Sequence, residues 1–239
     1  MCSSHPQFPA DDFDANGFAI FQLLTSENFA LLKKFVVEVL QNLFHIYAHR
    51  SVSEEDLLLY HLWGKQEKIP HAEMLKAKNR HLQPSVEIEQ ILLNGFLDRF
   101  LAAIGIRKYK LWDEGLGWLA FRLIRPGPGD GYPFSCKNWG PAKGVYSFWI
   151  PIFGFDPNLM IHLIPGSHTQ EHPRYLPSDT HFTKDEYRLA SSPSPDACLR
   201  PKMQPGEALC FHPKTLHAEE VSSGSCTRCN IEFRVLPCE

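Results

Sequence analysis

Two cysteines near the end of the sequence have a spacing that can support metal or redox chemistry. Cys226 and Cys229 form a C-x-x-C pair within a total of seven cysteines. A zinc site normally needs a second pair of cysteines or histidines at matching spacing. This pair lies in a stretch that reads as a strand, and an odd, irregular set of cysteines gives no disulfide framework. We therefore expect buried, reduced thiols, as in a cytoplasmic protein.

Two arginines could form a positively charged mouth for an anionic substrate. Arg122 and Arg125 are an odd number of positions apart in a stretch expected to be a strand, so their side chains point to opposite faces. We expect Arg125 to point inward, because it lies nearer the Gly-Pro-rich loop at residues 126–133.

A long polar segment at residues 169–205 is a further candidate for ligand or partner contact. Loops of this length in a compact domain usually bind ligands or cover a site, or else are mobile. Six of its side chains suit polar contact, and suit an ordinary solvated loop equally well: His172, Arg174, Tyr175, His181, Lys184 and Tyr187.

The elements that must position these residues change in character along the chain. Apolar residues recur at three- and four-residue steps over residues 27–47, with Ser26 as a possible cap. Further helices are expected at 54–63, capped by Ser53, and at 85–104. From residue 106 onward, short apolar runs separated by Gly and Pro predict strands at 107–112, 117–125, 145–153, 160–164, 207–211 and 228–236.

This order of elements predicts a single α+β domain over residues 1–239. A mostly helical part at 1–105 would buttress a jelly-roll core at 106–239. The composition fits a soluble folded protein, with 44% hydrophobic and 21% charged residues. A net charge of −3 and no basic stripe argue against nucleic acid. We see no signal peptide or membrane span, so we expect a cytoplasmic protein with a small-molecule partner and leave its oligomeric state open.

Several stretches of the strand-rich half, read in order, resemble one known family. They are SFWIPIFGF (147–155), LMIHLIPGSH (159–168) and GEALCFHPKTLHAEE (206–220), followed by SCTRCNIEFRV (225–235). The opening DANGFAIFQLL (14–24) fits as well, whereas residues 45–115 resemble the family only weakly. The sequence thus resembles the phytanoyl-coenzyme-A-hydroxylase-like branch of the iron(II)/2-oxoglutarate dioxygenases. That resemblance implies a double-stranded β-helix of cupin-like type, with 2-oxoglutarate and Fe(II) as cofactors.

The resemblance also assigns roles to particular residues. The distal iron-binding His of the family falls on His217, where a metal could bind. Arg228 stands eleven residues later, where the family places the Arg that grips the distal carboxylate of 2-oxoglutarate; Arg234 is the competing candidate. Trp149 falls on the barrel wall beside this cosubstrate, although core packing would explain it equally well. Two more histidines resemble structural markers of the fold: His168 and His212.

The sequence departs from the family where the other two iron ligands should lie. The family has an H-x-D or H-x-E motif before the strand that contains FWIPI, but the stretch DGYPFSCKNWGPAKGVYSFWIPI has no His. The family's H-x-D motif is followed two residues later by a Trp. When this Trp is aligned with Trp139, the two ligand positions fall on Ser135 and Lys137, and neither side chain suits Fe(II). Asp130 and Cys136 are nearby replacements, but they would build a site unusual for an oxygenase.

Three functions follow from these observations. We favour a metal-free member of the fold that binds a small acidic metabolite or glycan precursor, for which 2-oxoglutarate or a similar carboxylate is the candidate ligand. In it, the Lys137 ammonium could replace the metal cation, and Lys137 and His217 could act as acid and base, although an exposed loop lysine would explain Lys137 equally well. The alternative is a functional Fe(II)/2-oxoglutarate hydroxylase of a sugar or lipid-linked precursor that uses non-standard ligands. A third possibility is partner binding through residues 169–205.

Overall fold

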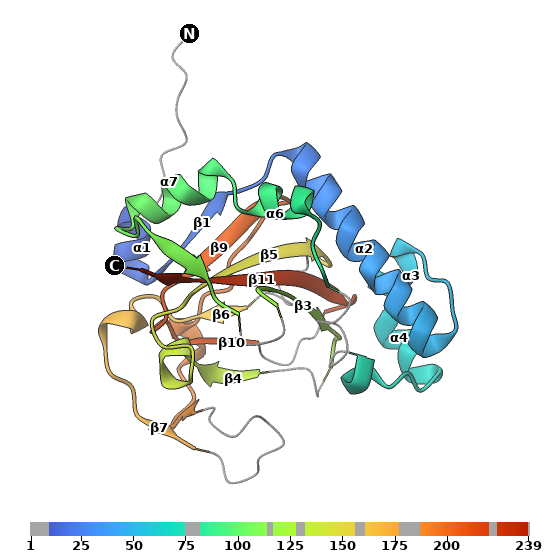
Figure 1. Cartoon of the computed structure of the whole chain (residues 1–239). Coiled ribbons are helices and arrows are strands. Elements are labelled where there is room, and N and C mark those ends of the chain that lie inside the picture. Colours follow the sequence, from blue (N-terminus) through green and yellow to red (C-terminus); the bar gives the residue numbers. More distant parts are fainter. Residues whose placement is uncertain are drawn as a thin grey trace.

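The computed structural model describes residues 10–74, 82–113, 117–127, 132–155, 161–176, 187–219 and 224–238. Within these ranges, the helices precede most of the strands, as Figure 1 shows. The helices are α1 (Ala10–Asn16), α2 (Ser26–Ala48), α3 (Glu54–Leu58), α4 (Tyr60–Gln66), α6 (Val86–Leu92) and α7 (Gly95–Ala103). The strands are β1 (Phe18–Gln22), β2 (Tyr109–Leu111), β3 (Leu119–Ile124), β4 (Tyr132–Ser135), β5 (Tyr146–Phe153), β6 (His162–Leu163), β7 (Arg174–Tyr175), β8 (Arg188–Leu189), β9 (Glu207–Phe211), β10 (His217–Glu219) and β11 (Arg228–Pro237).

These strands form two main antiparallel sheets. The larger sheet has the order β1-β9-β5-β11-β2, and β3 also pairs with β11. The smaller sheet has the order β4-β10-β6, and β7 pairs with β8 in a separate ribbon. Figure 1 shows α2, α6 and α7 along one side of the larger sheet, with β4, β6 and β10 on its other side. The described residues therefore form an α+β fold with antiparallel sheets.

The outer face of the larger sheet packs against the helices. Phe148 of β5 and Phe233 of β11 are fully buried in the same apolar cluster as Leu32 and Val36 of α2. The rings of Phe148 and Phe233 stack with their centroids 4.9 Å apart. Burying a large apolar side chain contributes about 1.5–3 kcal/mol, so this layer holds helices and sheet together.

Strand β11 has two chemically different faces. It pairs with β5 along one edge and with β3 along the other. Because side chains alternate along a strand, its apolar residues share the helix-facing side. These are Cys229, Ile231, Phe233 and Val235. The intervening residues point into the space between the two sheets: Arg228, Asn230, Glu232 and Arg234. This polar side of β11 positions the candidate site.

The regions predicted to be helical do form helices, but the residues at which the helices begin and end differ from the prediction. Helix α2 confirms the periodicity of residues 27–47, but its cap is Thr25 rather than Ser26, since the Thr25 hydroxyl accepts a hydrogen bond from the Asn28 amide. Residues 85–104 form two helices instead of one. The reason is Asn94, whose side-chain oxygen caps α7 by accepting from the Phe96 amide at 2.8 Å. Likewise, the predicted helix 54–63 is divided between α3 and α4, although Ser53 caps α3 as expected.

Two further expectations concern membranes and thiols. Among the described helices, none combines the length and the apolar character that crossing a membrane requires. Cys229 is buried in the outer face of β11 and Cys226 is half-buried, and neither is part of a disulfide within the described residues.

Candidate functional site

Six charged side chains meet between the inner faces of the two sheets. They come from β3, β10 and β11 and from a short 3-10 helix, η1 (Lys137–Trp139), that follows β4. We call them the inner-face cluster: Arg122, Lys137, Glu219, Arg228, Glu232 and Arg234. These described residues contribute four cationic groups and two carboxylates, a balance that favours an anionic ligand.

Glu232 is the centre of this cluster. Its carboxylate accepts hydrogen bonds from Arg234 Nε at 2.7 Å, Arg122 Nε at 3.2 Å and Ser147 Oγ at 3.4 Å. Lys137 Nζ lies 3.4 Å from the same carboxylate. Burial raises the pKa of Glu232, but the positive charges of Arg234, Lys137 and Arg122 outweigh burial and hold this pKa well below its usual value. Glu232 is therefore ionised at neutral pH.

Arg228 is the most deeply buried charge of the cluster, with 1% of its surface exposed. Its Nη2 donates to Glu219 Oε1 at 2.9 Å, and its guanidinium lies 5.2 Å from the ring centroid of Trp149. Glu219 also lies 3.5 Å from Nη1 of Arg122, so it links Arg228 to the rest of the cluster. Burial lowers the pKa of Arg228, but a guanidinium stays charged in proteins.

His217 lies beside the cluster as a neutral imidazole. Its Nδ1 donates to the Thr215 carbonyl at 2.9 Å, and its ring lies 4.6 Å from that of Phe211. Burial, together with the nearby Lys137 charge, lowers the pKa of His217 to about 4. Because Nδ1 carries the proton, Nε2 keeps a lone pair that can bind a metal or accept a proton.

Ser135 lies beside His217, and the Lys137 charge is close enough to His217 to lower its pKa. Ser135 is the register partner of His217 across β4 and β10, and Lys137 pairs with Glu232. A hydroxyl and an ammonium do not fit the two-histidine, one-carboxylate donor set that holds Fe(II) in non-heme oxygenases. The part of the chain that the structure describes contains no group of three or more His, Cys, Asp or Glu able to hold a metal ion.

The two replacement ligands do not complete such a site. Cys136 lies on the opposite face of the smaller sheet, in a cluster with Phe134 and Ala218. Burial raises the pKa of its thiol to about 11, so the metal-binding thiolate is disfavoured. Asp130 lies outside the described residues.

The prediction that Arg125 points inward is wrong. Arg122, not Arg125, points inward and contacts both carboxylates of the cluster. The alternation argument holds along β3, since Phe121 and Leu123 face the helices. Strand β3 ends at residue 124, and beyond it the guanidinium of Arg125 lies 6.0 Å from the ring centroid of Tyr60 in α4.

Four polar residues of this inner surface were not predicted from the sequence: Ser147, Glu219, Asn230 and Glu232. A signal for two of them was present. In RCNIEFRV, polar residues alternate strictly with apolar ones, which indicates a strand with one polar and one apolar face. Both competing arginines, Arg228 and Arg234, therefore lie on the same face and contact carboxylates.

The side chains of the polar segment 169–205 that the structure describes near β7 and β8 lie on another surface. The guanidinium of Arg174 in β7 lies 4.7 Å from the ring centroid of Tyr187 and 5.9 Å from that of Trp139. Tyr187 and Leu189 pack on the outer face of the smaller sheet. His172 is half-buried, its Nε2 2.9 Å from the Ser167 carbonyl, and Tyr175 is exposed. The predicted contact residues His181 and Lys184 lie outside the described residues.

His168 and His212 lie near α1, away from the inner-face cluster. The rings of these two histidines are 5.4 Å apart, and His168 Nε2 lies 3.1 Å from the Asp14 carbonyl. Their position agrees with a structural role.

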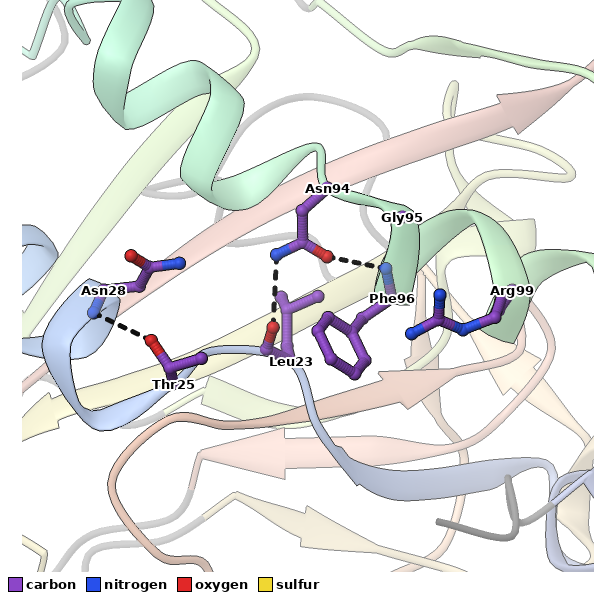
Figure 2. A pocket seen from close by; sticks show the side chains of 7 residues that line it. All are labelled: Leu23, Thr25, Asn28, Asn94, Gly95, Phe96 and Arg99. Atoms are coloured by element: carbon purple, nitrogen blue, oxygen red, sulfur yellow. Dashed lines mark hydrogen bonds between the residues drawn. The ribbon is translucent and has the colours of Figure 1, made fainter. Parts of the chain in front are cut away.

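A separate surface pocket of about 230 Å³ lies where α2 and α7 begin, and Figure 2 shows its lining. The lining residues are Leu23, Thr25, Asn28, Asn94, Gly95, Phe96 and Arg99. The side chains of Thr25 and Asn94 are already used as helix caps, and Asn94 Nδ2 also donates to the Leu23 carbonyl at 3.2 Å. The lining contains no carboxylate, His or Cys, so this pocket lacks the groups for acid-base or metal chemistry.

Comparison with known proteins defines the class of fold. No family model matches the chain, and no curated protein matches its sequence. The fold itself is shared with solved structures that include the non-heme monooxygenase ThoJ.

Three such structures have low sequence identity to the chain but nearly full coverage of it. The non-heme monooxygenase ThoJ has a TM-score of 0.59 and 12% identity, covering 95% of this chain and 76% of its own. AviO1 from Streptomyces viridochromogenes has a TM-score of 0.59 and 15% identity, with coverages of 98% and 96%. EvdO2 from Micromonospora carbonacea var. aurantiaca, complexed with 2-oxoglutarate, has a TM-score of 0.53 and 15% identity, with coverages of 100% and 94%.

Proposed function

We propose that this chain binds a small acidic metabolite or glycan precursor between the two sheets of a double-stranded β-helix, without an Fe(II) triad. The observation that carries the proposal is the buried guanidinium of Arg228, held on the inner face by Glu219 and Trp149. A planar guanidinium forms a bidentate, charge-assisted pair with a carboxylate. A fold relative supports an acidic ligand, since EvdO2 is complexed with 2-oxoglutarate.

The groups beside Arg228 support binding without iron. In the family that the sequence resembles, the positions of Ser135 and Lys137 hold a His and a carboxylate. Here the Lys137 ammonium pairs with Glu232 close to His217, and a positive charge at this place repels a dication. If the bound acid reacts, the neutral Nε2 of His217 is the base and the ammonium of Lys137 is the acid.

The alternative function is an Fe(II)/2-oxoglutarate-dependent hydroxylase with non-standard ligands. One observation favours it: the Nδ1 hydrogen bond to Thr215 leaves His217 Nε2 oriented as metal-binding histidines are. The fold relative ThoJ is also known as a nickel complex. Under this alternative, residues beyond the described ranges, such as Asp130, would have to supply the missing ligands.

Two measurements on the same protein decide between these functions. The protein is loaded anaerobically with Fe(II), desalted and analysed for iron, and tryptophan fluorescence is then titrated with 2-oxoglutarate and with glutarate. We expect far less than one iron per chain and quenching that disappears in Arg228→Leu. The matched control Arg107→Leu, which removes an exposed arginine, should bind as the parent does.

Two outcomes would contradict the proposal. About one iron per chain, lost in His217→Ala, would establish the hydroxylase instead. Absence of quenching by both acids, and by hydroxylated acids such as D-gluconate, would show that the inner-face cluster does not bind this class of ligand. The variant Trp149→Phe tests whether the signal comes from the ring beside Arg228.

A further inference from the structure

Asn230 is the one residue on the inner face of β11 whose side chain has no described partner. It lies between Arg228 and Glu232 on the same face of the strand, and none of its surface is exposed. Neither its Nδ2 nor its Oδ1 has a hydrogen-bond partner among the described residues. A buried amide that has lost its hydrogen bonds to water is unfavourable unless a partner replaces them. The position therefore indicates a ligand that completes both hydrogen bonds.

The indole of Trp149, on the neighbouring strand β5, also has a polar atom without a partner among the described residues. Trp149 is 1% exposed, and its Nε1 is buried without a hydrogen-bond partner in the described part of the chain. It is the register partner of Glu232 across β5 and β11, and its ring lies beside Arg228. On these two residues, two donors, Asn230 Nδ2 and Trp149 Nε1, and one acceptor, Asn230 Oδ1, remain to be satisfied.

The acceptor atom Asn230 Oδ1 limits the chemistry of the ligand, because only a ligand with a hydrogen-bond donor can satisfy it. A carboxylate or a keto oxygen can accept from Nδ2 and Nε1, but neither has a hydrogen for Asn230 Oδ1. An ammonium could supply one, but the inner-face cluster already has four cationic groups against two carboxylates, so a further positive charge is unfavourable. A hydroxyl group supplies both a donor and an acceptor without charge.

We infer that the ligand of this site is a hydroxylated acid, such as a 2-hydroxy acid or a sugar acid, rather than 2-oxoglutarate or another acid without hydroxyl groups. This inference rests on the proposed function, because Arg228 binds the carboxylate. Asn230 then pairs with a hydroxyl of the same ligand, and Trp149 donates to an oxygen of it.

The test compares three five-carbon diacids that differ only at C2, and adds two sugar acids that carry several hydroxyl groups. Isothermal titration calorimetry is performed with glutarate, 2-oxoglutarate and both enantiomers of 2-hydroxyglutarate, and with D-gluconate and D-glucuronate. At least one hydroxylated acid should bind about tenfold or more tightly than 2-oxoglutarate and glutarate, because a site built for a hydroxyl discriminates strongly against ligands that lack it. In Asn230→Leu, this preference should fall to about twofold or less.

Thermal unfolding separates ligand recognition from a structural role. Asn230→Leu should unfold at a temperature no lower than the parent's, because leucine removes two unpaired polar atoms while it keeps the number and branching of the side-chain heavy atoms. A second variant, Trp149→Phe, keeps an aromatic ring but loses the N–H and should weaken the hydroxylated acids severalfold. The control Asn42→Leu, on the exposed side of α2, should leave every affinity unchanged.

The failures of the two proposals are distinguishable. If 2-oxoglutarate or glutarate binds as tightly as every hydroxylated acid, the hydroxyl inference is overturned, but the proposed acid binding stands. If no acid of either kind binds, the proposed function itself is contradicted. An affinity preference that persists in Asn230→Leu would show that the hydroxyl is recognised elsewhere.

Discussion

The carboxylate of Glu232 holds together charges that would otherwise repel one another. Arg122, Lys137 and Arg234 all lie within hydrogen-bonding or ion-pair distance of it, and 5% of its surface is exposed. Removing one partner of a buried ion pair leaves the other charges uncompensated in a medium of low polarity. The close approach of three of the four cationic groups therefore depends mainly on this one carboxylate.

This dependence gives a prediction for the substitution Glu232→Gln. The isosteric amide should lower the free energy of unfolding by about 3–5 kcal/mol, because three cations lose their shared carboxylate. Urea unfolding at neutral pH measures the change. The control Glu38→Gln removes an exposed carboxylate of α2, 3.9 Å from Lys34, and should change stability by less than about 0.5 kcal/mol. Equal unfolding midpoints for the two variants would contradict a stabilising role for Glu232.

At the scale of elements, the start of β11 is held against the chain that follows β5. Gly154 has a φ of +72°, a left-handed conformation that favours glycine. A Cβ atom there would lie 2.5 Å from the Thr227 carbonyl oxygen and 2.7 Å from Arg228 Cα. Both are backbone atoms, so neither can rotate away. The close approach of these two segments fixes the backbone of Arg228.

Gly154→Ala should therefore be far more destabilising than an ordinary glycine replacement. We expect a loss of more than about 3 kcal/mol in the free energy of unfolding, from the steric clash and the backbone conformation together. Gly105→Ala is the matched control, because Gly105 has a φ of +84° but a Cβ atom there would meet nothing within 4 Å, so only about 1–2 kcal/mol should be lost. Similar losses in the two variants, measured by urea unfolding, would show that close packing at Gly154 is unimportant.

Elements with a strong local signal were predictable, and those fixed by distant partners were not. Helix α2 was predictable from the spacing of its apolar residues, and β9 from its short apolar run. Strand β9 matches its predicted range. Strand β10 has three residues and follows Pro213 and Lys214, so only its pairing with β4 and β6 makes it a strand. The candidate site was predictable to the same extent. The polar face of β11 could be predicted from the alternation in RCNIEFRV. The contacts that Arg122 of β3 and Lys137 of η1 make with Glu232 could not, because they depend on the packing of distant segments.

For the whole molecule, buried histidines connect stability to pH. Burial lowers the pKa of both His212 and His217 to about 4, well below the value of about 6.5 expected in an unfolded chain. In the window between these values, the unfolded chain binds more protons than the folded one, so stability falls as the pH falls. Glu232 adds a further loss only below the pKa of an unfolded glutamate, because its folded pKa is lowered.

We therefore expect stability to decrease on acidification from about pH 7 to pH 5, by up to about 1.4 kcal/mol per pH unit for each histidine. Urea unfolding at pH 7.5, 6.5, 5.5 and 5.0 measures the slope. His212→Gln should give a shallower slope, whereas His45→Gln, which removes an exposed histidine of α2, should leave it unchanged. A stability that is constant across this range would contradict the burial of neutral histidines.

The central place of β11 also determines when the main sheet can form during synthesis. In the native order, β11 separates β3 from β5, so these two earlier strands have no direct pairing with each other. A ribosome releases β3 and β5 before residues 228–237 exist, and each strand then presents an unpaired edge to its surroundings. The larger sheet can close only after translation has passed this strand. Nascent chains of this protein should therefore depend on chaperones until β11 emerges.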